Sequence, residues 1–265
     1  MSFLVGDKLM EDHISLVYED YGDTAGTPLI ILHGFFASSR NWRQIAKRFA
    51  DYYHVYVLDM RNHGLSPHAE NMDYSLMAAD LKYFMDVHQL QTANILGHSM
   101  GGKVAMWFAL NNPERVEKLL IVDISPVCYQ HSFDQTINAL IQLPLEEITN
   151  RKQADEFLSA FIPELSYRQF LLQNLQLKEG QYRWRIDLDV FYRTADNIIA
   201  FPEFKGIEPY KGAVLFMMGG NSTYLDRQAI MECFPKAEIV IIKEASHWLH
   251  IDKPAEFLDA VLGFL

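Results

Sequence analysis

Short apolar runs alternate with amphipathic segments along most of the chain. Each run is followed by apolar residues at helical spacing, which is the pattern of buried strands joined by helices. Continuous apolar strands of this kind predict a mostly parallel sheet covered by helices on both faces. An earlier stretch, Ile14–Tyr18, is expected to add an antiparallel edge strand. The clearest runs lie at residues 28–33, 54–59, 93–96, 119–122, 213–217 and 238–242.

This alternation stops between residues 126 and 212. The interval is polar overall, and its larger apolar residues fall at helical spacings with no clear central strand. They are Phe133, Ile137, Leu140, Phe157, Phe161, Phe170, Leu171 and Leu175. We therefore predict an α/β fold in two parts: a core formed by residues 1–125 and 213–265, and a helical cap formed by residues 126–212 over the end of the sheet.

Composition narrows the class of protein. The 265 residues suit one large domain carrying an insertion. Asp and Glu number 34 against 23 Lys and Arg, a formal charge of −11, so we expect neither nucleic-acid binding nor attraction to an anionic membrane. No apolar run approaches the ~20 residues of a membrane span, and Met1–Asp7 lacks the basic start of a secretory signal. Cys128 and Cys233 form no disulfide framework and are interpreted as reduced thiols of a cytoplasmic protein.

The strongest chemical signal is Gly97-His98-Ser99-Met100-Gly101, a Gly-x-Ser-x-Gly motif between a predicted strand and a predicted helix. A nucleophile at such a sharp turn has a strained backbone, and side chains two positions before and after it are crowded. Glycine at both positions removes those side chains and leaves the serine hydroxyl free above the sheet. The helix start then offers N–H groups to a developing oxyanion. The alternative is a tight turn that carries a serine by chance.

A second loop, His33-Gly34-Phe35-Phe36, follows the first central strand. We predict that it brings the Phe35 N–H beside the Met100 N–H, so that two donors face one oxyanion. The alternative is a turn glycine between core aromatic residues. His33 itself is given a structural role.

Serine needs a base, and ten histidines compete for that role. His247 is the candidate because it follows the last apolar strand, which places it on the same rim of the sheet as Ser99. His98 adjoins Ser99, but neighbours on a tight turn point in different directions, so His98 is kept only as a supporting residue. His247 and His250 are also spaced as a metal pair, yet no carboxylate or cysteine cluster accompanies them, and no metal site is predicted.

The base needs an acid that fixes its tautomer. The loop Gly219–Asp226 follows a late strand, where a triad acid is normally placed, but its first positions hold no carboxylate. Asp123 closes the strand after the nucleophile helix, so its side chain is expected on the rim where His247 lies. Asp123 is therefore the predicted acid, and Asp226 is the reserve.

Together these features resemble the α/β-hydrolase superfamily over essentially the whole chain. The chain order of nucleophile, acid and histidine matches that superfamily. The resemblance implies an α/β-hydrolase fold, with a mostly parallel central sheet, helices on both faces and an inserted helical cap. It also implies that Asp59 and Arg61 form a structural turn, and we leave both out of the site. The segments that carry it are His33-Gly34, Asp59–Ser66, Gly97–Gly102 and the residues around His247.

Within the superfamily the chain is similar to the YbfF-type bacterial esterases and, more distantly, to the mammalian abhydrolase-domain protein 11. The likeness implies a cytosolic acyl esterase or thioesterase in which Ser222 supports the acid and the histidine by hydrogen bonding. Trp184 and other aromatic residues of the cap either line an acyl pocket or pack the lid, and the sequence leaves both open. The segments concerned are Val122–Val127, Tyr182–Arg185 and Gly219–Ser222.

The leading hypothesis is hydrolysis of a small-molecule carboxylic ester or acyl thioester through an acyl-enzyme on Ser99, with no cofactor. The protein is expected to be a monomer or a small homo-oligomer. One alternative uses the same three residues for an elimination or a carbon–carbon cleavage, and another is a non-catalytic binding protein. The serine at position 99 excludes the aspartate nucleophile that dehalogenases and epoxide hydrolases of this fold use.

Overall fold

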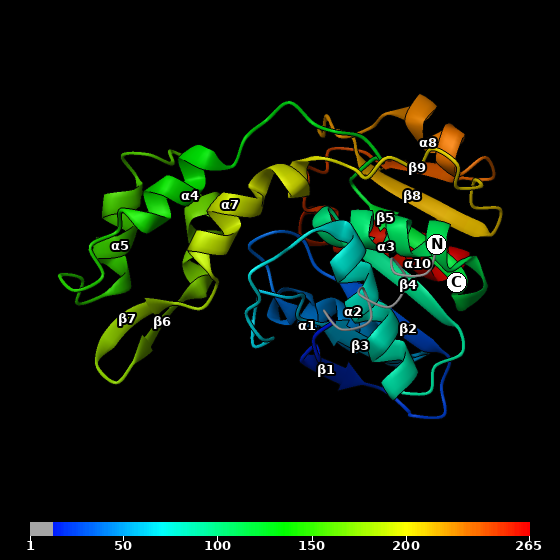
Figure 1. The fold of residues 1–265 in the computed structure, drawn as a ribbon, viewed down its shortest axis with the longest axis horizontal. Coiled ribbons are helices and arrows are strands. Elements are labelled where there is room, and N and C mark those ends of the chain that lie inside the picture. The colour runs from blue at the N-terminus through cyan, green and yellow to red at the C-terminus, as the bar shows by residue number, and fades with distance from the viewer. Residues whose placement is uncertain (1–12) are drawn as a thin grey trace, which may run out of the picture.

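A seven-stranded sheet forms the centre of the molecule in the computed structural model, which describes residues 13–265 (Figure 1). Its strands lie in the order β1-β3-β2-β4-β5-β8-β9. The edge strand β1 (Tyr18–Tyr21) runs antiparallel to β3 (His54–Leu58), and the other pairs are parallel. The mostly parallel sheet predicted from the apolar runs is confirmed. Its other strands are β2 (Pro28–Leu32), β4 (Ala93–His98), β5 (Val116–Val122), β8 (Ala213–Gly219) and β9 (Glu238–Ile242).

The antiparallel edge strand lies later in the chain than the sequence predicts. It was expected at Ile14–Tyr18 but begins only at Tyr18. The preceding backbone is bound elsewhere: the Ile14 N–H donates to Asp80 Oδ1 at 2.8 Å, and the Val17 N–H donates to Ser66 Oγ at 2.8 Å. Side chains thus accept from both of these N–H groups, while the Val17 carbonyl accepts the N–H of Asp59, the residue after β3, at 2.8 Å.

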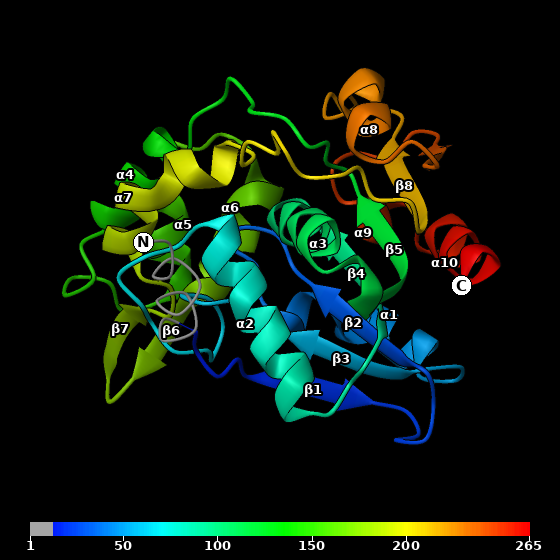
Figure 2. The ribbon, with the colours of Figure 1, turned by 45° about the vertical axis from the view of Figure 1, so that its right-hand side comes forward.

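Alternate residues of the strands enter two hydrophobic cores on opposite faces of the sheet. In β2, Ile30 and Leu32 belong to one core, and Leu29 and Ile31 belong to the other. Both faces are covered, which explains why the strands are apolar at every position rather than at alternate ones. The first face is covered by α2 (Tyr74–Val87), α3 (Met100–Asn111) and α8 (Arg227–Cys233), and the second by α1 (Arg43–Phe49) and α10 (Pro254–Phe264) (Figure 2).

The chain reverses its direction of travel across the sheet at β2. It leaves β3 on one side of β2 and returns as β4 on the other side, so the carboxyl ends of β2 and β4 are paired neighbours. In open α/β sheets, ligands bind in the crevice outside such strand ends. Within residues 13–265, no helix combines the length and hydropathy that crossing a membrane requires. Short elements complete this part: η2 (Ser39–Trp42), η3 (Pro113–Arg115) and α9 (Leu249–Asp252).

Between β5 and β8 the chain leaves the sheet and forms what we call the insertion, residues 126–212. In Figure 2 the arrows of β2 and β3 point toward the side of the sheet on which the insertion lies. The insertion therefore lies by the carboxyl ends of the strands, where the candidate residues are expected. Its helices are α4 (Asp134–Ile141), α5 (Arg151–Leu158), α6 (Leu165–Leu171), η4 (Leu172–Asn174) and α7 (Leu188–Ile199).

The insertion also contains a hairpin that the helical spacings do not predict. Strands β6 (Leu175–Lys178) and β7 (Gln181–Trp184) pair antiparallel across a two-residue turn. Glu179 and Gly180 in that turn have φ of 54° and 80°. Two consecutive positive φ values match the turn that suits the twist of a short hairpin, and a glycine in it is the sequence signal that the helical pattern concealed.

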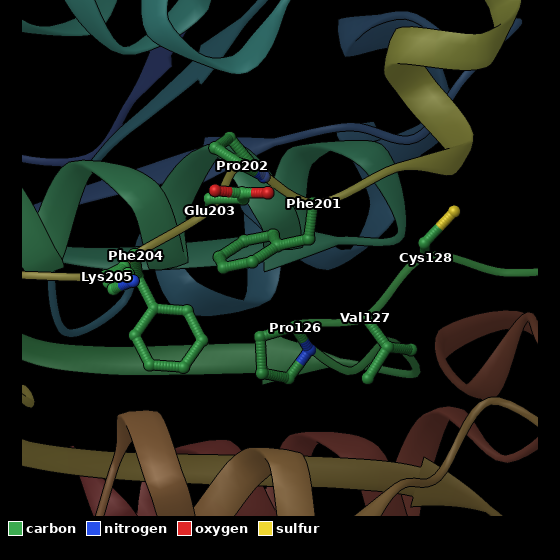
Figure 3. Close-up of a pocket in the computed structure, with 8 residues that line it drawn as sticks. All are labelled: Pro126, Val127, Cys128, Phe201, Pro202, Glu203, Phe204 and Lys205. Atoms are coloured by element: carbon green, nitrogen blue, oxygen red, sulfur yellow. The ribbon is translucent and has the colours of Figure 1, made fainter.

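The two chain crossings between core and insertion lie next to each other. Figure 3 shows Pro126 and Val127 of the outgoing crossing with Phe201 and Phe204 of the returning one. Together with Cys128, Pro202, Glu203 and Lys205 they line an open hollow of about 700 Å³. The hollow thus lies between the two crossings, and its lining is mostly apolar.

Two side chains of the core bind the carboxyl end of α7. Lys103 of α3 is only 1% exposed, and its ammonium donates to the carbonyls of Ile199 at 2.6 Å and Ala200 at 2.7 Å. Tyr74 of α2 donates its hydroxyl to the Ile198 carbonyl at 2.6 Å. Burial lowers the pKa of Lys103 to about 7. The last carbonyls of α7, which have no partner within the helix, are therefore satisfied by the core.

Candidate active site

Ser99 lies at the turn between β4 and α3, with a φ of 53° and a ψ of −117°. Positive φ at a residue other than glycine is strained, and this turn is the nucleophile elbow of the motif. A Cβ atom at Gly97 would lie 2.3 Å from the Gly101 carbonyl oxygen, and one at Gly101 would lie 2.3 Å from that of Leu32. This is the crowding that the motif predicts, and only glycine fits at either position.

Asp123 and His247 meet across the carboxyl end of β8, the strand that lies between β5 and β9. Asp123 follows β5, and His247 lies in the segment between β9 and α9. His247 Nδ1 is 2.7 Å from Asp123 Oδ2. Because an ionised carboxylate only accepts hydrogen bonds, Nδ1 carries the proton and Nε2 is the basic nitrogen. The aspartate side chain is fully buried, whereas that of His247 is 23% exposed, which keeps its ring within reach of a substrate.

The Asp123 carboxylate receives two further hydrogen bonds. The Gly219 N–H donates to Oδ1 at 2.7 Å, and the Ser222 hydroxyl donates to Oδ2 at 2.6 Å. The structure thus places Ser222 where the family resemblance implies. Asp226, the reserve acid, instead begins α8, where its carboxylate accepts the Ala229 N–H at 3.0 Å.

His98 supports His247 from the other side. It is 4% exposed, and its Nε2 lies 2.9 Å from the His247 carbonyl oxygen, to which it donates. The two ring centroids are 4.7 Å apart. Burial lowers the pKa of His98 well below its usual value, and a charge on His247 lowers it further, so His98 is a neutral donor. It contacts the backbone of the base rather than a reacting atom.

The loop after β2 packs directly against the elbow. The Gly101 N–H donates to the His33 carbonyl at 3.1 Å, and a Cβ atom at Gly34 would lie 3.2 Å from Ser99 Cβ. Met100 is the first residue of α3, so its N–H has no acceptor within the helix. No hydrogen bond is recorded for the Phe35 N–H in the described part of the chain. Among residues 13–265, neither predicted oxyanion donor has a hydrogen-bond acceptor, and the loop after β2 contacts the elbow from which α3 begins.

His33 fixes the shape of that loop. Its Nε2 accepts the Met60 N–H at 3.0 Å, and its Nδ1 donates to the Gly34 carbonyl at 2.8 Å. Complete burial lowers its pKa, against the opposing effect of the Asp59 charge. A neutral ring satisfies both bonds, which agrees with the structural role expected for this residue.

Aromatic rings of the insertion lie against the same loop. The Phe35 ring stacks on Phe191 of α7 with centroids 4.4 Å apart, and Phe133, just before α4, is 4.9 Å from it. Phe36 is 5.4 Å from Phe191. The sequence places Phe133 among the cap aromatics, but it carries no signal for Phe191, whose partners come from a distant part of the chain.

Sequence reasoning missed two tyrosines: Tyr224, which lies beside the base, and Tyr129, which binds Tyr224. The Tyr224 ring centroid is 4.6 Å from that of His247. Tyr129 donates its hydroxyl to the Tyr224 carbonyl at 2.8 Å and accepts the Ser125 N–H at 2.8 Å. Tyr129 belongs to the outgoing crossing, so this contact joins the insertion to the loop between β8 and α8, in which Tyr224 packs against His247. Neither tyrosine has a motif around it that marks it in advance.

Trp184 lies within the packing of the insertion. It ends β7, and its indole N–H donates to the Leu140 carbonyl of α4 at 3.1 Å. Its role toward an acyl group stays a prediction. His250, the second histidine of the spacing considered for a metal, is buried and stacks on Trp42 with centroids 4.1 Å apart. Among residues 13–265, no group of three or more metal-ligating side chains is present.

The sheet, the elbow and the strand-end residues define an α/β-hydrolase. The chain belongs to this family, whose α/β hydrolase fold matches residues 27–254. Among solved structures, a marine microorganism esterase matches with a TM-score of 0.91 at 41% identity, covering 95% of this chain and 100% of that chain. The fold class expected from the sequence is thereby confirmed.

Two curated relatives carry more specific names. The sn-1-specific diacylglycerol lipase ABHD11 of Xenopus laevis is 42% identical over 95% of this chain and 84% of its own length. The esterase YbfF of Escherichia coli (strain K12) is 32% identical over 90% of this chain and 93% of its own length. Both resemblances found in the motifs are confirmed, although the identities rank ABHD11 above YbfF, the reverse of the order that the motifs suggest.

Proposed function

We propose that this protein hydrolyses carboxylic esters of small molecules through an acyl-enzyme on Ser99. The observation that carries the proposal is the 2.7 Å hydrogen bond between His247 and the buried Asp123, at strand ends adjacent to a serine in an elbow conformation. The relatives support the same chemistry, because an esterase and a lipase are both named for ester cleavage.

Each group has a defined part in the reaction. Ser99 Oγ attacks the ester carbonyl carbon while His247 Nε2 takes the hydroxyl proton. The N–H groups of Phe35 and Met100 stabilise the tetrahedral oxyanion. Its collapse breaks the bond to the alcohol oxygen, and His247 returns the proton to that oxygen. Asp123 stays ionised throughout and stabilises the imidazolium.

Water completes the cycle with the same residues. His247 takes a proton from a water molecule, which attacks the acyl-enzyme carbonyl and forms a second oxyanion in the same place. Collapse releases the carboxylic acid and returns the proton to Ser99. An acyl thioester follows the same steps with a thiol as leaving group, and all atoms balance without a cofactor.

The insertion is proposed to act as a cap over this centre, with residues 126–212 as its bounds. Phe133 and Phe191 face the Phe35 side of the site. An acyl chain attached to Ser99 would then meet apolar rings rather than water, as a hydrophobic acyl group requires.

The test compares Ser99→Ala with Ser222→Ala. We expect Ser99→Ala to lose both p-nitrophenyl ester hydrolysis and covalent labelling by a fluorophosphonate. Ser222→Ala keeps the label, because the Ser222 hydroxyl donates to Asp123 and accepts the Tyr224 N–H but does not attack the substrate. Continued labelling and activity in Ser99→Ala would overturn the proposal, with circular dichroism confirming that both variants are folded.

A second measurement separates ester hydrolysis from the alternatives. Wild-type protein is tested with p-nitrophenyl esters and acyl-coenzyme A thioesters of increasing chain length, and the acyl-serine is sought by mass spectrometry. An acyl group on the Ser99 peptide is expected. Turnover without it would favour an elimination, and absence of both labelling and turnover would favour a binding protein.

A further inference from the structure

Outside the groups that the mechanism uses, one buried cationic nitrogen lacks a partner. Arg185 follows β7, and its Nε is buried without a hydrogen bond within the described chain. The arginines that form ion pairs there are Arg43, Arg61, Arg115 and Arg168. A guanidinium stays charged at any pH of interest, and a buried donor without an acceptor is costly. Such a group calls for an acceptor that the chain itself does not supply.

Further positive charge gathers around this nitrogen. Burial lowers the pKa of Arg185, and the charges of Arg40 and Arg151 lower it further. Arg151 also donates to the carbonyl of Leu175, in the strand β6 that pairs with β7, so it lies close to the segment that carries Arg185. Asp59 opposes them. Its two oxygens, however, already accept backbone N–H groups at 2.6 and 2.8 Å. Three positive charges thus face one negative charge here, in a protein whose formal charge is −11.

Arg185 and Arg40 both flank the oxyanion loop. The backbone N–H of Arg185 donates to the Asn174 carbonyl at 2.8 Å, and the Asn174 side chain donates its Nδ2 to the Phe36 carbonyl at 2.7 Å. Arg40 lies in η2, where the next residue, Asn41, donates its Nδ2 to Gln173 Oε1 at 2.8 Å. The segments that carry the two arginines are thus joined to each other and to the loop after β2.

We propose that Arg185 and Arg40 form an anion-binding subsite beside the oxyanion loop, which takes a carboxylate or phosphate group carried by the substrate. Nε and one terminal nitrogen of a guanidinium form a fork that matches two oxygens of either group. This inference rests on the proposed function, because it specifies the substrate further, as an ester that carries an anionic substituent. A local positive patch is what such a substrate needs to approach a strongly acidic protein.

The experiment uses three activated esters with the wild-type protein and its variants. One is uncharged p-nitrophenyl butyrate, one is mono-p-nitrophenyl glutarate with a carboxylate on the acyl part, and one is 4-phosphonooxyphenyl butyrate with a phosphate on the leaving group. We expect Arg185→Gln to raise KM for at least one anionic ester about 10- to 100-fold. Its KM for the uncharged p-nitrophenyl butyrate should stay within about twofold of the wild-type value. The ester that responds shows which part of the substrate carries the anion.

Two further variants sharpen the result. Arg185→Lys keeps the charge but not the fork, so partial recovery of KM is expected. Arg183→Gln is the matched control, because Arg183 is an exposed arginine of the same hairpin whose hydrogen bond is to the Gln181 side chain at 3.3 Å. No change with any ester is expected for it.

The outcomes distinguish this inference from the proposed function. If Arg185→Gln raises KM equally for all three esters, the arginine has a structural role. If it raises KM for none of them, the subsite does not exist. Either result overturns the inference, whereas wild type that cleaves none of the three esters contradicts the proposed function. Should Arg185→Gln fail to fold, Arg40→Gln replaces it: Arg40 is exposed, and a selective but smaller rise in KM is expected, so an unchanged KM overturns the subsite.

Discussion

The core and the insertion contribute different kinds of contact to the candidate active site. On the core side, Asp123 accepts hydrogen bonds from His247, Gly219 and Ser222, each at 2.6 or 2.7 Å. On the insertion side, Phe133 and Phe191 pack their rings against the loop at centroid distances of 4.9 and 4.4 Å. The first contacts define one geometry, and the second define a shape and a polarity.

This difference predicts how substitutions in each region behave. A buried polar network loses its function when one member is changed, because the remaining groups are left unsatisfied. Aromatic and aliphatic packing tolerates substitutions of similar volume at a smaller cost. Changes in the core are therefore expected to lower the rate with all substrates, whereas changes in the insertion should alter the choice among substrates.

The largest effect is expected at the acid. Asp123→Asn removes the charge that orients His247 and stabilises its protonated form, and kcat should fall by up to about four orders of magnitude with KM little changed. Asp226→Asn is the matched control, since Asp226 caps α8, and its kcat is expected within about twofold of wild type. Both are assayed on one activated ester. If kcat fell strongly in Asp226→Asn and stayed near the wild-type value in Asp123→Asn, the acid of the triad would be Asp226, on the later loop.

The next effect concerns the lysine that binds the two regions together. Burial lowers the pKa of Lys103 to about 7, whereas an unfolded lysine titrates near 10.4. Between these values the unfolded chain binds more protons, so the stability of the folded protein rises with pH. Relative to Lys103→Met, the free energy of unfolding of wild type should therefore increase by roughly 2 kcal/mol from pH 7 to pH 9.

Urea unfolding at pH 7, 8 and 9 measures this effect. Lys118→Met is the matched control: Lys118 also donates to two carbonyls, those of Phe264 and Leu265, each at 2.8 Å, but it is only half-buried. If the free energy of unfolding of Lys118→Met differed from that of wild type with the same dependence on pH, the effect would not come from the burial of Lys103. The measurement stops at pH 9 so that the tyrosines do not ionise in either state. Burial raises the pKa of Tyr74 and Tyr129, so their ionisation in the unfolded chain at higher pH would lower the stability of the folded protein. Parallel curves for wild type and Lys103→Met would contradict the prediction.

The core was largely predictable because its signals are local. Strands buried on both faces are apolar at every position, and the candidate residues directly follow such strands or begin a helix. Ser99, Asp123 and His247 could therefore be placed on one rim from their positions in the chain. The structure brings Asp123 and His247 into contact and puts Ser99 at the strained turn, while their catalytic roles stay proposals.

The insertion side was less predictable because its contacts join distant segments. No local pattern indicates that Tyr224 lies on His247, or that Phe191 stacks on Phe35. Lys103 did carry an overlooked signal. It is the one charged residue in a helix whose other residues are mostly apolar. A helix without a polar face is buried on all sides. A lysine in such a helix is therefore expected to donate to acceptors within the protein.

A smaller effect is expected at the hydroxyl that supports the acid. Ser222→Ala removes one hydrogen bond to Asp123 and leaves its contacts with Gly219 and His247, so kcat should fall about tenfold. Ser246→Ala is the control, because that hydroxyl is next to His247 in the chain but binds Asp252 at 2.5 Å. Equal losses in the two variants would mean that the effect comes from the loop rather than from the hydrogen bond to Asp123.

The smallest effect tests whether the insertion selects the acyl group. Phe133→Leu removes an aromatic contact of the Phe35 ring and opens space at the edge of the loop, so the ratio of kcat/KM for long against short p-nitrophenyl esters should rise about threefold. Phe157→Leu is the control, since Phe157 packs on Phe161 with centroids 5.5 Å apart, within the insertion itself. Its ratio is expected to match wild type. A uniform loss of rate in Phe133→Leu would show that the insertion positions the reacting groups, and the contrast with the core would then be wrong.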